Sequence, residues 1–198
     1  MSSVMVDRKT IRYILKHINR AREIVAKVYG IRKSLVALAL RGDISEREFY
    51  KISSVLTPQS RSPMWERYFR EKHGCAPVKK DENQGDFEKH GKYYEYKVSG
   101  YNADGAVHIV QIRLWQNCDY VVQSISDDEV VTFVLSHAEM RQETKLLHAT
   151  TAHGTKEVTD ASRHVELRMT LKTGTEDWER WVKRYRKNYF GEIVARQA

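Results

Sequence analysis

The sequence predicts an α/β fold of the mixed α+β kind, in which a central mixed β-sheet is flanked by helices and preceded by an N-terminal helical segment. Three observations lead to this prediction. Apolar residues recur at helical spacing in the first part of the chain and again near its end. Between residues 86 and 125, short runs of β-branched and aromatic residues alternate with turn residues, which is typical of strands. Of the 198 residues 41% are hydrophobic and 30% charged, which is enough for a packed core.

Residues 1–57 are predicted to form a basic helical segment. Over residues 8–29 the apolar side chains fall on one face of a helix, and most basic side chains fall on the opposite face. Two shorter helices follow, and Ser45 with Glu48 forms a capping box at the start of the second. The segment has 12 Lys and Arg against 5 Asp and Glu, so it carries +7 of the net charge of +8.

The basic face of the first helix is a candidate DNA contact, formed by Lys9, Arg12, Lys16 and Arg20. Basic side chains that lie along phosphates give an affinity that is independent of sequence and sensitive to salt. A solvated helix face explains the same pattern. The apolar face opposite can serve either dimerisation or internal packing.

The remaining elements follow from caps, turns and periodicity. Ser62 and Pro63 predict the start of a helix, and Ser136 with Glu139 and the acids after Thr175 predict the starts of two more. In chain order, the predicted helices cover residues 8–29, 34–40, 45–55, 62–72, a stretch from 136 and a stretch from 175. The predicted strands cover residues 86–88, 93–99, 107–115, 119–125 and 164–171, and a further apolar run covers residues 130–135.

The most informative stretch is the hairpin formed by residues 85–99. With His90 and Gly91 at its tip, Asp86 lies directly across from Glu95, so two carboxylates face each other at about 5 Å between Cβ atoms. Such a pair is destabilising without a cation, which Lys97 supplies in part and a divalent ion such as Mg²⁺ supplies better. A turn aspartate beside an ordinary exposed Glu–Lys pair on an edge strand is the alternative.

The next predicted strand, residues 107–115, is expected to pair with the Glu95 strand. A register centred on the intervening loop places Gln111 opposite Glu95 and Arg113 on the same face. Asp86, Glu95, Lys97 and Gln111 are then expected to form a polar cluster on three adjacent strands.

Asp86 followed by Glu95-Tyr96-Lys97 resembles the PD-(D/E)XK nuclease superfamily, which includes most type II restriction endonucleases. The resemblance covers residues 62–126, and Gly85 replaces the proline that usually precedes the aspartate. It implies a restriction-endonuclease-like core over residues 58–198, after the helical segment of residues 1–57.

The resemblance also implies a reaction and a set of site residues. Asp86, Glu95 and the backbone carbonyl of Tyr96 are implied to hold Mg²⁺, for which Mn²⁺ is a substitute. Lys97 is implied to orient the attacking water. Glu66, on the preceding helix, is implied to join the site as a further ligand, and Gln111 matches a glutamine that some branches carry. The products implied have 5′-phosphate and 3′-hydroxyl ends.

A polar loop after the catalytic strands is a candidate for contacts with DNA bases, since such residues donate and accept at base edges. The candidates, together with the phosphate contact Arg113, are Thr151, His153, Thr155, Lys156 and Arg163. A solvated loop explains the same composition.

The most favoured function is a sequence-specific restriction endonuclease that cuts double-stranded DNA, expected as a homodimer without membrane association. The two cysteines are too few for a disulfide framework, and neither a signal peptide nor an apolar run of about 20 residues is present. A cytoplasmic protein of bacterial, archaeal or phage origin is therefore expected. The alternatives are a DNA-processing nuclease of the same fold and a non-catalytic DNA-binding module.

Overall fold

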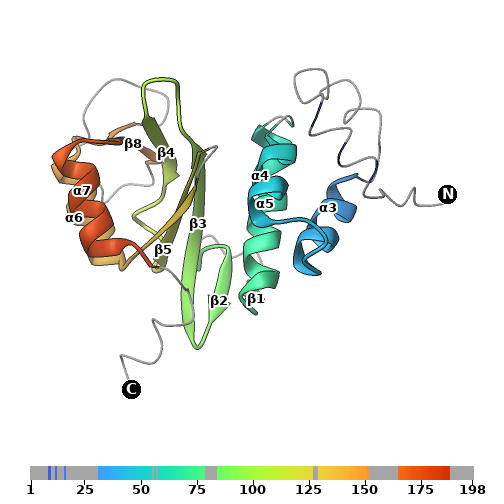
Figure 1. Cartoon of the computed structure of the whole chain (residues 1–198). Coiled ribbons are helices and arrows are strands. Elements are labelled where there is room, and N and C mark those ends of the chain that lie inside the picture. Colours follow the sequence, from blue (N-terminus) through green and yellow to red (C-terminus); the bar gives the residue numbers. More distant parts are fainter. Residues whose placement is uncertain are drawn as a thin grey trace. The chain divides into compact units, whose positions relative to one another are not determined.

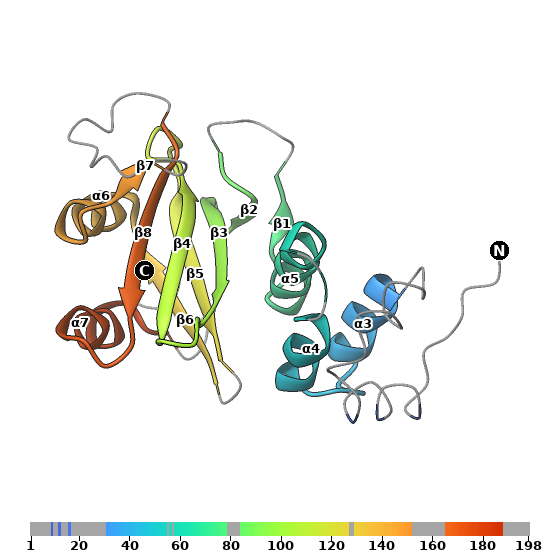
Figure 2. The same ribbon diagram turned by 90° about the horizontal axis from the view of Figure 1, so that it is seen from above.

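The computed structural model describes residues 9, 12, 16, 31–54, 56, 58–78, 84–126, 129–151 and 165–187. The chain divides into two compact units, residues 1–72 and residues 73–198 (Figures 1 and 2). The central sheet and its flanking helices confirm the predicted mixed α/β fold class. No helix in the described part of the chain has the length and apolarity needed to cross a membrane.

The first unit contains helices α3 (Ile31–Leu40), α4 (Glu46–Ser53) and α5 (Pro58–Lys72). The capping box of Ser45 and Glu48 is present at the start of α4, as predicted. Aromatic side chains join α4 to α5, with the rings of Phe49 and Tyr68 centred 4.4 Å apart. Trp65 anchors the same contact, because its indole N–H donates to the hydroxyl of Ser53 over 2.5 Å.

Helix α5 begins earlier than the sequence predicted. Pro58 is its first residue, and Pro63, predicted to open the helix, lies inside it. A proline inside a helix removes one backbone hydrogen bond, but the helix continues because Trp65 and Tyr68 bury their rings against α4. The structure groups α5 with the first unit, whereas the sequence placed residues 58–72 with the core.

The second unit is built on two β-sheets. The five-stranded sheet has the order β1-β2-β3-β5-β6, and the three-stranded sheet has the order β4-β8-β7. The strands of the first sheet are β1 (Ala76–Pro77), β2 (Phe87–Lys89), β3 (Lys92–Gly100), β5 (Asp119–Ile125) and β6 (Val130–Leu135). Those of the second are β4 (Ala106–Ile112), β7 (Thr150–Thr151) and β8 (Leu167–Lys172).

Strand β3 pairs with β5 rather than with β4, so the predicted pairing of Gln111 with Glu95 is wrong. The β3–β5 ladder is parallel and places Tyr120 beside Glu95. Val107 of β4 forms one isolated bridge with Tyr101, the residue that directly follows β3. The rest of β4 pairs with β8. The reason is packing, because β4 buries Val107 and further apolar residues in the core that β8 completes.

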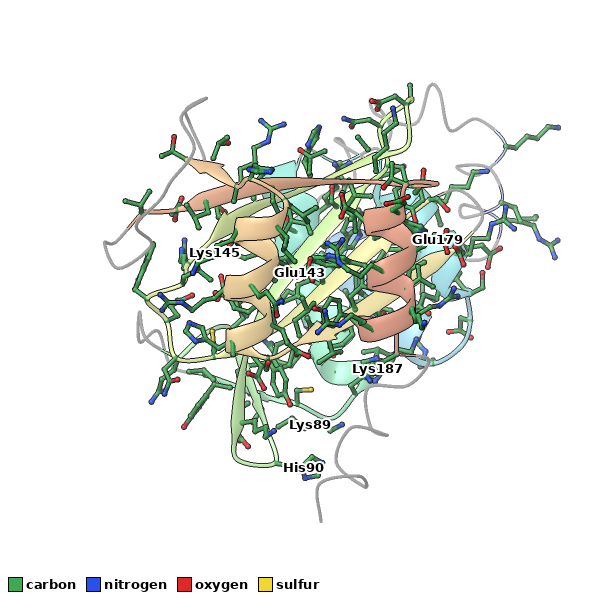
Figure 3. The ribbon with its side chains drawn as sticks, turned by 90° about the vertical axis from the view of Figure 1, so that its left-hand side faces the viewer. Lys89, His90, Glu143, Lys145, Glu179 and Lys187 are labelled. Atoms are coloured by element: carbon green, nitrogen blue, oxygen red, sulfur yellow. The ribbon has the colours of Figure 1, made fainter. Side chains whose placement is uncertain are left out.

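Helices α6 (His137–Leu146) and α7 (Glu176–Tyr185) lie side by side over one face of the strands (Figures 2 and 3). Met140 of α6 and Trp181 of α7 are fully buried in a core shared with β4, β5, β6 and β8. The predicted capping box of Ser136 and Glu139 opens α6, and Thr175 caps α7.

A buried carboxylate joins these two helices. Glu143 lies between α6 and α7 with no exposed surface, whereas Lys145 and Glu179 lie on the outer sides of the pair (Figure 3). The Glu143 carboxylate accepts hydrogen bonds from Arg180 (2.7 Å), the Trp181 indole (2.9 Å) and the Tyr185 hydroxyl (2.8 Å). The sequence did not predict this role, because Glu143 follows the pattern of an ordinary helix glutamate.

Candidate functional site

The hairpin of β2 and β3 forms the candidate site. His90 and Gly91 have φ values of 53° and 76°, as a tight two-residue turn with two left-handed residues requires. The turn pairs Lys89 with Lys92, and the ladder continues to the pair Phe87–Tyr94. The predicted register is therefore confirmed as far as the pair Phe87–Tyr94. The next residue, Asp86, lies before β2, and its N–H donates to the carbonyl oxygen of Tyr94, which brings its carboxylate close to Glu95.

Gly85 explains the departure from the usual proline before the aspartate. Its φ of +77° is outside the range that a proline ring permits. A Cβ atom on Gly85 would also lie 2.7 Å from the carbonyl oxygen of Tyr94 and 3.0 Å from the amide nitrogen of Glu95. A glycine is needed here because the chain passes against the backbone of the strand that carries Glu95.

Replacing Gly85 by alanine is expected to destabilise the protein by at least about 2 kcal/mol, since it combines an unfavourable φ with a backbone clash. Gly91→Ala is the matched control. Gly91 has nearly the same φ, but no atom lies within 4 Å of the position of an added Cβ. Urea unfolding of the two variants measures the difference, and equal decreases in stability would show that the approach to Tyr94 is unimportant.

Asp86 is held beside β3 by hydrogen bonds that its backbone and its side chain form. Its backbone N–H donates to the carbonyl oxygen of Tyr94 (2.8 Å), and its Oδ2 accepts from the N–H of Tyr96 (2.8 Å). The pKa of Asp86 is raised, first by burial and then by the negative charge of Glu95. The two carboxylates therefore repel each other, as predicted from their spacing.

Glu95 is the most deeply buried member of the site, with 2% of its surface exposed. Its Oε1 accepts from the ammonium group of Lys97 over 2.5 Å. Its Oε2 is buried and has no hydrogen-bond partner among the described residues. A buried carboxylate oxygen without a partner destabilises the folded protein. The position of Oε2 therefore favours binding of a cation beside it.

Two residues that the sequence did not place together complete the cluster. The guanidinium of Arg113 lies 3.9 Å from Glu95 and forms an ion pair of 2.9 Å with Glu166. The pairing of Ile112 with Leu167 brings them opposite each other. Arg113 and Glu166 are 53 positions apart in the sequence. Their contact could therefore have been predicted only from the pairing of β4 with β8.

The cluster has three carboxylates and two cations. The carboxylates belong to Asp86, Glu95 and Glu166, and the cations to Lys97 and Arg113. If all five groups are charged, their formal net charge is −1. The cluster therefore attracts a further cation, although the chain as a whole is basic.

Cys118 is buried close to this cluster but is not a nucleophile at neutral pH. Burial, followed by the charges of Glu95 and Asp86, raises the pKa of its thiol to about 12. The thiol is therefore protonated, and hard oxygen ligands remain the donors that suit Mg²⁺.

The oxygen atoms at this edge are of the hard kind that Mg²⁺ prefers as ligands. The carboxylates of Asp86 and Glu95 are available, and the Tyr96 carbonyl oxygen lies on the same edge because the N–H of Tyr96 faces Asp86. No group of three or more His, Cys, Asp or Glu side chains with metal-site geometry occurs in the described ranges. A metal site here rests on two carboxylates and a backbone carbonyl.

Two further predicted site residues belong to other elements of the chain. Gln111 is exposed on β4 with a φ of 55°, at an irregularity of the ladder. Glu66 belongs to the first unit, where it pairs with Arg70 over 3.1 Å. The catalytic roles of both residues stay predictions.

The predicted DNA contacts are only partly within the described residues. Lys9, Arg12 and Lys16 have helical backbone and exposed side chains, and Thr151 is half-buried in β7. Arg113 lies in the candidate site. The other predicted contacts, namely Arg20, His153, Thr155, Lys156 and Arg163, lie outside the described residues.

The fold and site define a mixed α+β protein with an acidic cluster, containing one lysine and one arginine, at the end of a β-hairpin. No protein-family model matches the sequence, and no curated protein matches it with significance.

Proposed function

We propose that the protein is a Mg²⁺-dependent DNA endonuclease of the restriction type, which cuts double-stranded DNA as a homodimer. The observation that carries the proposal is Glu95, a buried carboxylate with one unpartnered oxygen, placed close to Asp86 and beside Lys97. Two repelling carboxylates with a lysine at this spacing suit metal-assisted hydrolysis of a phosphodiester, as the PD-(D/E)XK resemblance implies.

Each residue has a distinct role in the proposed reaction. Asp86, Glu95 and the carbonyl of Tyr96 would hold Mg²⁺, which would activate a water and neutralise charge on the phosphate. Lys97 orients the water and stabilises the developing negative charge. The water oxygen attacks phosphorus, the bond from phosphorus to the 3′ oxygen breaks, and that oxygen takes up a proton. Mn²⁺ is expected to replace Mg²⁺.

Incubation with plasmid DNA and Mg²⁺ tests the proposal. Discrete fragments that disappear with a chelator support a sequence-specific endonuclease. A smear would favour the second candidate, a DNA-processing nuclease of the same kind. DNA binding without cleavage, in either Mg²⁺ or Mn²⁺, would contradict the nuclease and favour a non-catalytic binding module.

The N-terminal basic side chains are proposed to supply salt-sensitive affinity for DNA. Changing Lys9, Arg12, Lys16 and Arg20 together to glutamine is expected to weaken binding. It is also expected to reduce the slope of log K against log salt by about 0.9 for each phosphate that the protein no longer neutralises. Titration of a labelled duplex at several salt concentrations measures this slope.

A matched control removes four exposed positive charges from other positions in residues 1–72, namely Arg41, Arg47, Lys51 and Arg67. This set is expected to change the slope less. If the two sets have the same effect, or if the first set leaves the slope unchanged, the basic face is not a specific DNA contact.

A further inference from the structure

The fold fixes the position of the Arg113 backbone. It follows β4 directly after the irregularity between Ile109 and Ile112, where Gln111 has a φ of 55°. Such bulges redirect the side chains that follow them. The hydroxyl of Tyr120, which neighbours Glu95 on β5, donates to the carbonyl oxygen of Arg113 over 2.9 Å. Arg113 is therefore tied to the strand beside the acidic pair.

The guanidinium of Arg113 is held in one orientation. Oε1 of Glu166 accepts from both its Nε and its Nη2, at 2.9 Å each. The remaining nitrogen, Nη1, lies 3.9 Å from Oε1 of Glu95, which is beyond hydrogen-bond distance. The side chain keeps 34% of its surface exposed, so solvent and a ligand can reach it.

Arg113 is not needed to neutralise the charge of Glu95, because Lys97 already donates to Oε1 of Glu95 over 2.5 Å. The position of the Arg113 guanidinium therefore needs another explanation. With Glu95 paired to Lys97 and Glu166 paired to Arg113, Asp86 supplies the residual negative charge. A divalent ion at the acidic pair changes the formal net charge of the cluster from −1 to +1. A phosphodiester, which carries one negative charge, complements that charge.

We propose that Arg113 is a catalytic residue which binds a non-bridging oxygen of the scissile phosphodiester, and that Glu166 is the positioning residue that orients it. This inference rests on the proposed nuclease function and deepens it. Arginine suits the role because its planar fork presents several donors to phosphate oxygens and stays charged. Arg113 forms no covalent bond, and its contribution is to hold the phosphate and stabilise charge in the transition state.

The test compares four variants of the full chain: Arg113→Ala, Arg113→Lys, Glu166→Gln and the control Arg67→Ala. Arg67 is an exposed arginine in an ion pair with Glu71, so it matches Arg113 in charge and pairing. Single-turnover cleavage of plasmid DNA with Mg²⁺ gives the rate. Calorimetric titration with Mn²⁺ gives cation binding, and titration of a labelled duplex without a divalent ion gives DNA binding.

Arg113→Ala is expected to slow cleavage by about 100-fold or more, as for removal of one preorganised donor. Mn²⁺ binding is expected to be retained or tightened, because a positive charge near Glu95 is removed. Arg113→Lys is expected to recover little of the rate, since an ammonium group cannot replace the fork. Glu166→Gln keeps an acceptor for Arg113 and is expected to slow cleavage by about tenfold with unchanged Mn²⁺ binding.

Each contrary outcome has a separate meaning. A wild-type rate in Arg113→Ala, or a decrease equal to that of Arg67→Ala, would overturn the inference and leave the nuclease proposal standing. Loss of Mn²⁺ binding together with cleavage would overturn it too, by indicating a structural role for Arg113. A wild-type protein that binds DNA but never cleaves it would instead overturn the proposed function.

Discussion

Lys97→Ala and Asp86→Asn are each expected to lower the rate of Mg²⁺-dependent DNA cleavage by about a thousandfold or more, while DNA affinity changes by less than about tenfold. Lys97 is the cation that contacts Glu95, at 2.5 Å, and Asp86 is the carboxylate whose charge interacts with that of Glu95. Asp86 is proposed to hold the metal ion and Lys97 to orient the attacking water, and neither is proposed to bind the duplex. Plasmid cleavage and duplex titration of the same preparations separate the two effects.

Lys92→Ala is the control, because Lys92 is an exposed lysine on the same strand, at the hairpin turn. It is expected to cleave at close to the wild-type rate. Full activity in Lys97→Ala or in Asp86→Asn would remove the basis of the proposed function.

The Asp86→Asn variant also has an expected signature in stability. Burial and the charge of Glu95 raise the pKa of Asp86 above its ordinary value of 3.8. A carboxyl whose folded-state pKa is raised contributes stability below the unfolded-state pKa and loses it as the pH rises through the folded-state value. At pH 7 without metal, Asp86→Asn is therefore expected to be more stable than the wild type, and the difference is expected to diminish near pH 3.8.

Addition of Mn²⁺ is expected to stabilise the wild type and not Asp86→Asn, because only the wild type retains both carboxylates. Thermal unfolding across pH, with and without Mn²⁺, measures both effects. A metal-free Asp86→Asn protein that is less stable than the wild type at pH 7 would show that Asp86 has a structural role.

Glu143→Ala is expected to lower the free energy of unfolding by about 3 kcal/mol, because it removes three side-chain hydrogen bonds in the interior. Burial by itself would raise the pKa of Glu143, but the hydrogen bonds from Arg180, Tyr185 and Trp181 outweigh it and lower the pKa. The charged carboxylate therefore stabilises the packing of α7 on α6. Urea unfolding followed by tryptophan fluorescence is a direct measurement, since Trp181 donates to this carboxylate.

The pH dependence gives an independent check on Glu143. A lowered folded-state pKa contributes stability above the unfolded-state value, and that stability is lost as the pH falls through the folded-state value. The difference between wild type and Glu143→Ala is therefore expected to narrow below about pH 4.5. Glu179→Ala, an exposed glutamate on α7, is expected to change stability by less than about 1 kcal/mol. Equal effects of the two substitutions would contradict the assigned role of Glu143.

Features encoded over a few residues could be predicted from the sequence. Both capping boxes, at Ser45 and at Ser136, occur as predicted because a cap involves only one turn of helix. The hairpin register follows from the two-residue turn at His90 and Gly91, which leaves one way to pair its strands. That register was sufficient to predict that the carboxylates of Asp86 and Glu95 lie close together.

Features that join distant segments could not be predicted in this way. The loop of residues 101–105 after β3 does not by itself fix the partner of the next strand, and burial of apolar side chains selected β8 for β4 and β5 for β3. The same selection removed Gln111 from the expected pairing and brought Arg113 to Glu166. Pro63 lies within a helix for a similar reason, since burial of the neighbouring aromatic rings outweighs its poor helix propensity.

Local sequence is enough to specify the acidic pair and its lysine, because short-range strand alternation and one tight turn bring Asp86, Glu95 and Lys97 together. The surroundings of these three residues depend on long-range packing. Only the packed core places Arg113 and Glu166 at the end of the hairpin, and only burial leaves one oxygen of Glu95 without a partner among the described residues. The physical reason is range: a turn acts over a few residues, whereas burial depends on segments that meet only after the chain has folded.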